Sequence, residues 1–219
     1  MVRYWKADTT SVSIIIKICI FVKTNKMKSR IEKCIKSAVK NYTSIFQDDH
    51  LKANIQQIVA ESVIAFQSDK KMLFCGNGGS ASDAQHIAAE LSGKFYADRP
   101  PLYAEALHVN PSFMTAVAND YGYEATFSRM VEAAGKKGDI LVGISTSGNS
   151  PNVVKAIQKA KELGMKTVGF TGKNGGAMRD LCDITICVPS NDTPRVQEAH
   201  ILVGHIICQL IEQEMFPDA

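Results

Sequence analysis

The sequence has 219 residues, of which 45% are apolar, 21% charged and 7% aromatic. This composition is typical of one globular domain with a sizeable core, and it excludes a disordered or fibrous chain. The formal net charge is +3, but residues 1–26 hold five basic residues and one acidic residue, which leaves 20 bases and 21 acids in the rest. A nucleic-acid-binding domain would carry a basic stripe, so we expect no nucleic-acid partner.

The six cysteines include no Cys-x-x-Cys pair. Most of them lie inside apolar stretches such as Met72–Cys75, as expected for reduced core residues. We therefore expect a cytoplasmic protein rather than a secreted one that disulfides stabilise.

Residues 11–22 form an apolar run of twelve residues that Lys17 interrupts. The run is shorter than the roughly 20 residues of a membrane-spanning helix, and no small-residue cleavage site follows it. We expect no membrane partner and no signal peptide. Because an amphipathic pattern begins at Met27, we interpret residues 1–26 as an unstructured extension without stable packing, and residues 27–219 as one domain.

Two helices are predicted to precede the first strand. Apolar residues recur from Ile31 to Phe46 at the spacing of one helical face, and a second helix is expected from Asp49, a plausible N-cap, to Phe66. Beyond them, apolar runs that predict strands alternate with helical patterns. The expected strands are 71–75, 103–109, 139–144, 166–170 and 183–188; the expected helices are 82–96, 111–118, 151–163, a short one after 176, and 195–215. This alternation indicates a three-layer α-β-α sandwich with a parallel, about five-stranded sheet.

Small and polar residues collect where the predicted strands end, which is the edge where parallel sheets bind ligands. Residues 145–150 follow a buried strand and precede Pro151, which suits the first position of a helix. Free backbone N–H groups and the dipole at a helix start favour an anion. The loop contains no lysine or arginine, so it suits a sugar phosphate held by neutral donors, or else it is a polar turn with a helix cap. Residues 76–80 lack the spacing of a dinucleotide or Walker-type loop.

These loops carry a resemblance to a known family. Residues 145–150 (STSGNS) resemble the signature of sugar isomerase (SIS) domains, and residues 76–86 (GNGGSASDAQH) resemble the phosphoheptose isomerases within that family. Further matches are residues 119–123 (NDYGY) and 194–200 (PRVQEAH). The similarity runs from about Met27 to Pro217, and several long motifs in the same order make it specific. It implies a flavodoxin-like SIS fold and a homo-oligomer, expected to be a tetramer.

Four residues are candidate metal ligands. His86 and Glu90 are four residues apart on one predicted helix, so they share a face and can converge on one metal or substrate. Gln197 and His205 lie about 12 Å apart along the last helix, which is awkward for one site unless both side chains lean inward or another subunit contributes. The resemblance implies that all four residues, His86, Glu90, Gln197 and His205, bind zinc, one ion per subunit.

The resemblance also implies an activity. Phosphoheptose isomerases convert sedoheptulose 7-phosphate to D-glycero-D-manno-heptose 7-phosphate, which feeds lipopolysaccharide core or surface polysaccharide synthesis. This aldose–ketose isomerisation passes through an enediol or enediolate, and it needs one group for the carbon proton and another for the oxygen proton. By resemblance, Glu90 is the base and His205 the acid.

The resemblance assigns substrate contacts to three segments and to two further residues. The first loop contributes Asn77, Gly78, Gly79 and Ser80; the phosphate loop contributes Ser145, Thr146, Ser147 and Ser150; and Asn119, Asp120, Glu90 and Gln197 complete the expected set. Lys94 stands where the family pattern has arginine, and lysine lacks the planar fork of a guanidinium, so that contact is not carried over.

Two other functions remain open at this point. Some relatives are non-catalytic SIS proteins that bind the replication initiator, but in those the positions of Glu90 and His205 are replaced, whereas both residues are present here. A SIS domain that senses a sugar phosphate would need no metal and would normally carry a DNA-binding domain, for which residues 1–26 are too short.

Overall fold

The computed structural model describes the backbone of residues 9–218 and the side chains of residues 26–218. The chain divides into two units, residues 1–40 and residues 41–219. Helix α1 (Thr9–Gln47) supplies the described part of the first unit and the beginning of the second. In the part of the chain that the structure describes, no helix is both long enough and apolar enough to cross a membrane.

Helix α1 differs from the extension that the sequence suggests. Residues 9–26 are helical, where an unstructured segment is expected, because no glycine or proline interrupts residues 9–47. Residues 1–8 lie outside the described residues. The domain boundary after residue 26 and the lack of stable packing before it stay predictions.

Five parallel strands form one sheet in the order β2-β1-β3-β4-β5, which confirms the expected parallel, five-stranded sheet. In the central pair, Met72 of β1 lies opposite Ile140 of β3, and Gly76 lies opposite Ile144. The strands are β1 (Met72–Gly76), β2 (Ala104–Ala106), β3 (Ile140–Ile144), β4 (Lys166–Thr171) and β5 (Ile184–Cys187).

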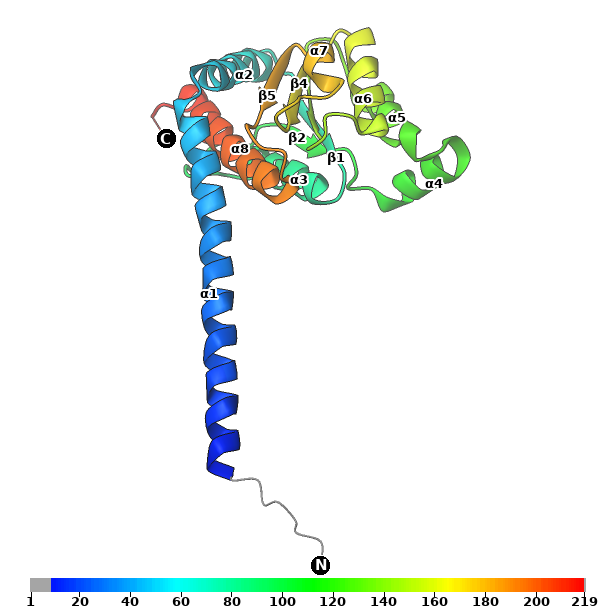
Figure 1. Cartoon of the computed structure of the whole chain (residues 1–219). Helices are drawn as coiled ribbons and strands as arrows, with labels where there is room; N and C mark the ends of the chain where they lie inside the picture. Colours follow the sequence, from blue (N-terminus) through cyan, green and yellow to red (C-terminus); the bar gives the residue numbers. More distant parts are fainter. Residues whose placement is uncertain (1–8, 219) are drawn as a thin grey trace, which may run out of the picture. The chain divides into compact units, whose positions relative to one another are not determined.

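Helices cover both faces of the sheet, as the three-layer prediction requires (Figure 1). Helices α2, α3 and α8 lie on one face, and α5 and α6 lie on the other (Figure 1). The helices after α1 are α2 (Asp49–Gln67), α3 (Gly79–Ser92), α4 (Pro111–Tyr121), the 3₁₀ helix η1 (Tyr123–Ala125), α5 (Thr126–Ala134), α6 (Pro151–Glu162), α7 (Met178–Leu181) and α8 (Thr193–Met215).

Alternate residues of each central strand belong to two separate hydrophobic clusters. Phe74 packs with the apolar faces of α2, α3 and α8. Its neighbour Leu73 packs with residues of α5 and α6 on the opposite face. Because successive side chains of a strand point to opposite faces, burial on both faces explains why the strands read as continuous apolar runs.

Some boundaries differ from those expected. The N-cap of α2 is Asp48 rather than Asp49, because Asp48 Oδ1 accepts the backbone N–H of Leu51 at 2.9 Å. Helix α3 ends at Ser92, followed by Gly93, rather than at Tyr96. Helix α5 is absent from the expected elements, because it is short and follows η1 directly.

The sheet order reverses direction between β1 and β3. After β1 the chain passes through α3 to β2 on one side, and after β3 it passes through α6 to β4 on the other. Such a reversal of direction is the place where open α/β sheets bind ligands, beyond the carboxyl ends of the strands. The first turns of α3 and α6 both begin there, so the two loops singled out in the sequence lie side by side at this edge.

Candidate active site

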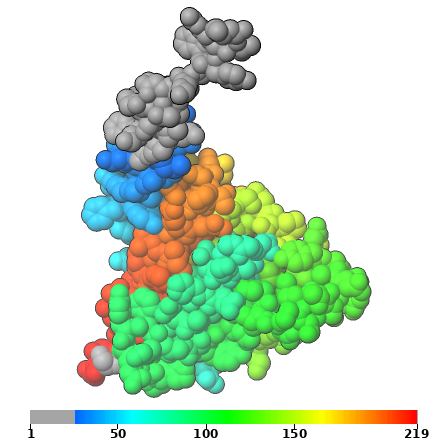
Figure 2. Space-filling model, turned by 90° about the horizontal axis from the view of Figure 1, so that it is seen from below, coloured from blue at the N-terminus to red at the C-terminus, as the bar shows by residue number. Residues whose placement is uncertain are grey.

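Helices α3 and α8 bring three potential metal ligands together. His86 Nε2 lies 3.0 Å from Glu90 Oε1 and 3.4 Å from His205 Nε2. One ligand atom from each residue lies within 4.8 Å of the others. Figure 2 shows the face on which the orange to red surface of α8 borders the teal to green surface of α3 and the loop after it.

This donor set fits zinc. Ligand atoms about 2.0–2.1 Å from a tetrahedral zinc ion stand about 3.3 Å apart. The distances from His86 Nε2 to Glu90 Oε1 and to His205 Nε2 are close to that value. Two imidazole nitrogens and one carboxylate oxygen are zinc donors, and catalytic sites keep a further position open. The His86 side chain is 49% exposed and that of Glu90 24% exposed, so a small molecule can reach them. The three residues form a site that can hold a divalent metal beside a substrate.

Gln197, the fourth expected ligand, extends from α8 to the first residue of α3 rather than to His86. A Cβ atom on Gly79 would lie 2.4 Å from Gln197 Nε2, so the Gln197 amide packs against the backbone at the start of that helix. Gly79 precedes His86 by seven residues, or about 10 Å of helix. The structure therefore gathers three of the four expected ligands, and the metal role of Gln197 stays a prediction.

The phosphate loop, residues 145–150, has hydroxyl groups that converge. Ser145 is buried, and its Oγ lies 2.9 Å from Ser150 Oγ and 3.4 Å from Ser147 Oγ. Thr146 fixes the loop through its carbonyl, which accepts the N–H of Gly172 at 3.0 Å. Gly148 has φ +66°, and a Cβ atom there would lie 1.9 Å from the Gly175 carbonyl oxygen, so only glycine fits. The loop presents neutral donors at the start of α6, as a phosphate site requires.

The first loop is fixed by its own polar network. Gly78 has φ +56° and is the N-cap of α3, and the buried Ser80 donates its N–H to the Asn77 carbonyl at 3.0 Å. The side chains of Asn77 and Asn152 exchange two hydrogen bonds of 2.9 Å, and Tyr123 Oη donates to Asn77 Oδ1 at 3.0 Å. Since Asn77 Oδ1 already accepts twice, Asn77 can offer a substrate only its remaining amide N–H.

Asn152 and Tyr123 are absent from the expected site residues. No spacing rule marks a buried asparagine at the start of a helix as the partner of a loop 75 residues earlier. The expected Asn119 and Asp120 are exposed at the end of α4, where Asn119 Nδ2 donates to Asp120 Oδ1 at 2.7 Å. The structure pairs these two with each other rather than with either loop, and their substrate role stays a prediction.

Asp83 is a further residue that sequence reasoning missed. It is half-buried, and its Oδ2 has no hydrogen-bond partner within the described residues. Burial raises the pKa of Asp83 to about 6, although the nearby His86 opposes the shift. The available signal was its position three residues before His86, which places both on one face of α3.

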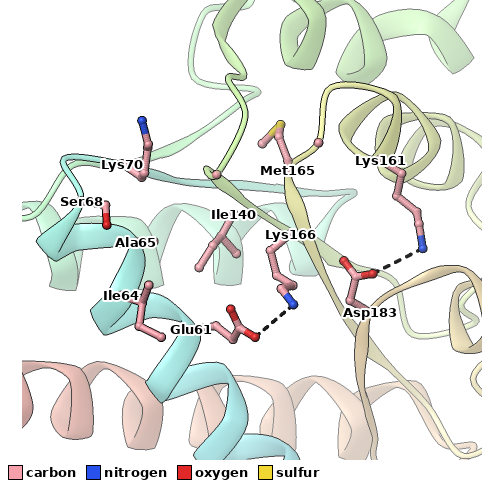
Figure 3. A pocket seen from close by; sticks show the side chains of 12 residues that line it. Glu61, Ile64, Ala65, Ser68, Lys70, Ile140, Lys161, Met165, Lys166 and Asp183 are labelled. Atoms are coloured by element: carbon pink, nitrogen blue, oxygen red, sulfur yellow. Dashed lines mark hydrogen bonds and ion pairs between the residues drawn. The ribbon is translucent and has the colours of Figure 1, made fainter.

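A hollow of about 530 Å³ lies at the opposite edge of the sheet, where the strands begin. Two ion pairs occupy its carboxylates: Glu61 with Lys166 at 3.0 Å and Asp183 with Lys161 at 3.5 Å (Figure 3). Both carboxylates therefore already have lysine partners. Within the described residues, this hollow holds no group of three metal-ligating side chains.

Comparisons with known proteins agree with this geometry. A family model described as SIS domain matches residues 36–172. The phosphoheptose isomerases of Clostridium acetobutylicum and Aneurinibacillus thermoaerophilus are 53% and 48% identical to this chain over 190 residues, 87% of this chain and 97% and 96% of theirs. The solved structure of the phosphoheptose isomerase from Neisseria gonorrhoeae is 38% identical, with a TM-score of 0.80, covering 85% of this chain and 99% of that one. The chain therefore belongs to the SIS domain family and, within it, to the phosphoheptose isomerases.

Proposed function

We propose that this protein converts sedoheptulose 7-phosphate to D-glycero-D-manno-heptose 7-phosphate at the carboxyl edge of the sheet, beside α3, α6 and α8. The observation that carries the proposal is the convergence of Glu90 and His205 beside His86, since this reaction needs a carboxylate and an imidazole together. The names of the relatives above support the choice of substrate.

In the proposed reaction, Glu90 moves the proton between C1 and C2, and His205 manages the proton on the sugar oxygen. A partly exposed carboxylate is a suitable base, because the substrate can reach it and an imidazole lies close by to handle the second proton. Zinc held by His86, Glu90 and His205, one ion per subunit, would polarise the substrate carbonyl and stabilise developing negative charge. Gln197 would join them as the fourth ligand only after leaving its position against Gly79. The sensor and initiator-binding alternatives have no use for this cluster.

For binding, we assign the phosphate to Ser145, Thr146, Ser147 and Ser150, whose hydroxyl and backbone donors meet at the start of α6. Asn77, Gly78, Gly79 and Ser80 would contact the sugar from the start of α3, with Gln197 packed above them. Asn119 and Asp120 would reach sugar hydroxyls from α4.

The same proposal includes a cytoplasmic homotetramer that supplies lipopolysaccharide core or surface polysaccharide synthesis. Exposed apolar side chains recur along α1 at Ile31, Ile35 and Val39, a spacing typical of helices that pack together. Sedimentation of the full chain tests the oligomeric state, and a monomer at micromolar concentration would contradict this part.

The test of the activity is product formation from sedoheptulose 7-phosphate by the full chain, compared with Glu90→Gln. We expect Glu90→Gln to lower kcat by about 10²–10⁴-fold, the usual contribution of a general base. The matched control is Glu61→Gln, which changes a carboxylate in the hollow at the opposite edge of the sheet and should retain full turnover. Equal rates for the two variants would remove Glu90 as the base, and no turnover by the unaltered chain would overturn the proposed function.

A further inference from the structure

Arg99 and Glu212 form a buried ion pair beside the candidate metal ligands. Arg99 Nε lies 3.1 Å from Glu212 Oε2, and the two side chains are 1% and 5% exposed. Arg99 belongs to the loop after α3, and Glu212 lies near the end of α8. Since desolvating two charges is costly, such a pair persists only where hydrogen bonds satisfy its remaining atoms.

The Arg99 guanidinium closes the carboxyl end of α3. Its Nη2 donates to the Glu90 carbonyl at 2.9 Å, and its Nη1 donates to the carbonyls of Leu91 at 2.7 Å and Gly93 at 3.1 Å. A helix leaves its last carbonyls without partners and carries partial negative charge there, so a buried cation is well placed. The contact with Glu90 fixes the backbone of the proposed base.

Glu212 organises the loop on the other side of the pair. Its carboxylate accepts the backbone N–H groups of Phe95 at 3.2 Å, Tyr96 at 2.8 Å and Ala97 at 2.9 Å. Burial raises the pKa of Glu212, but these N–H groups and Arg99 outweigh burial and hold it below its ordinary value. The loop therefore closes around a charged carboxylate that α8 supplies.

The loop reaches the second proposed catalytic residue through Phe95. The ring centroid of Phe95 lies 5.7 Å from that of His205, which itself lies 4.9 Å from that of His86. Glu212 thus anchors Phe95 against His205, while Arg99 anchors Glu90. The Arg99–Glu212 ion pair therefore contacts the surroundings of both Glu90 on α3 and His205 on α8.

We propose that Arg99 and Glu212 are positioning residues that hold Glu90 and His205 in the geometry that binds the metal ion. The proposal rests on the proposed function for its effect on turnover, but its effect on metal affinity does not require the substrate. Residues that orient metal ligands typically change affinity or activity by about 10–100-fold when they are altered.

The experiment measures cobalt(II) affinity by chelator competition, together with kcat, KM and thermal unfolding, for the full chain and Arg99→Lys. Lysine keeps the charge but cannot bond several carbonyls at once. We expect cobalt affinity and kcat each to fall by about 10–100-fold, with KM changed by less than about 3-fold. The matched control is Asp139→Asn, which breaks the buried pair with Lys71 at the opposite edge of the sheet and should lower the Tm without changing cobalt affinity.

The proposal would be overturned if Arg99→Lys had a lowered Tm but bound cobalt as tightly as the unaltered chain. The ion pair would then have a purely structural role. If Arg99→Lys does not fold, Phe95→Leu decides instead: a loss of about 3-fold or more in cobalt affinity supports the proposal, and unchanged affinity overturns it. Failure of the proposed function is distinguishable, because the unaltered chain would then bind cobalt but not isomerise the sugar.

Discussion

The Nε2 atoms of His86 and His205 lie 3.4 Å apart, although 119 residues separate them in the chain. Their approach depends on the close packing of α3 against α8, the two helices that carry them. Gly204 permits that packing, because a Cβ atom there would lie 2.5 Å from Cδ1 of the buried Ile87. The neighbours of the two histidines therefore set their separation.

Gly204→Ala should push α3 and α8 apart. Alanine favours a helix by about 1 kcal/mol over glycine, yet overpacking a buried contact costs about 1–3 kcal/mol, so we expect a net loss of stability. We also expect weaker zinc binding, because the ligands on the two helices separate. Urea unfolding and chelator competition measure both effects, and a variant that is more stable and binds zinc normally would contradict this role of Gly204.

Ser147→Ala should weaken binding of the substrate phosphate. A hydrogen bond to a charged group contributes about 1.5–3 kcal/mol, which corresponds to an increase in KM of about 10–100-fold with a smaller change in kcat. Steady-state kinetics and inhibition by inorganic phosphate measure the effect. Ser128→Ala is the control, because Ser128 lies on α5 and donates to the Ala125 carbonyl. Equal phosphate inhibition of both variants would argue against the phosphate loop.

Asn152→Ala should release the side chain of Asn77. The variant loses both hydrogen bonds between the two amides, and it also removes the acceptor of the Val153 N–H. We expect a loss of about 1–3 kcal/mol in the free energy of unfolding and a higher KM. Tyr123→Phe removes only the hydroxyl donor and should have the milder effect of the two. The reverse order would show that Asn152 does not hold Asn77.

His200 should make the protein less stable in acid. It is buried and lies 3.1 Å from the Thr171 carbonyl through Nε2, and burial lowers its pKa to about 4. In the unfolded chain the His200 imidazole takes up a proton near pH 6.5. Protonation therefore stabilises the unfolded chain relative to the folded protein as the pH falls from about 6.5 to about 4, and the free energy of unfolding is then lower by about 3 kcal/mol. His200→Gln removes this pH-dependent loss of stability, because glutamine does not titrate. Urea unfolding between pH 7 and pH 4 should show a smaller loss for the variant, and parallel curves would contradict the assignment.

Much of the fold was predictable because its signals are local. Each strand is a short apolar run, and Gly78 and Gly148 mark turns with positive φ that glycine adopts readily. His86 and Glu90 were predictable as a pair because a helix sets their spacing. The zinc roles expected for Gln197 and His205 rest on the resemblance alone, since a spacing of eight residues along one helix does not by itself suggest a common site.

The remaining features depend on contacts that sequence patterns do not encode. Arg99 and Glu212 are 113 residues apart, and each would be placed on the surface by its charge alone. Asn152 meets Asn77 only because β1 and β3 are neighbours in the sheet. The start of α1 at Thr9 was not predicted, because an apolar run without glycine or proline does not mark the residue at which a helix begins.

The most direct test of the cluster as an isomerase centre is a zinc titration of metal-stripped protein, with turnover of sedoheptulose 7-phosphate as the readout. We predict negligible turnover without metal, a linear rise as zinc is added, and a plateau at one zinc ion per subunit, with His86→Ala failing to reach that plateau. Full turnover by the stripped protein, with no response to added zinc, would contradict the claim that His86, Glu90 and His205 act through a bound metal.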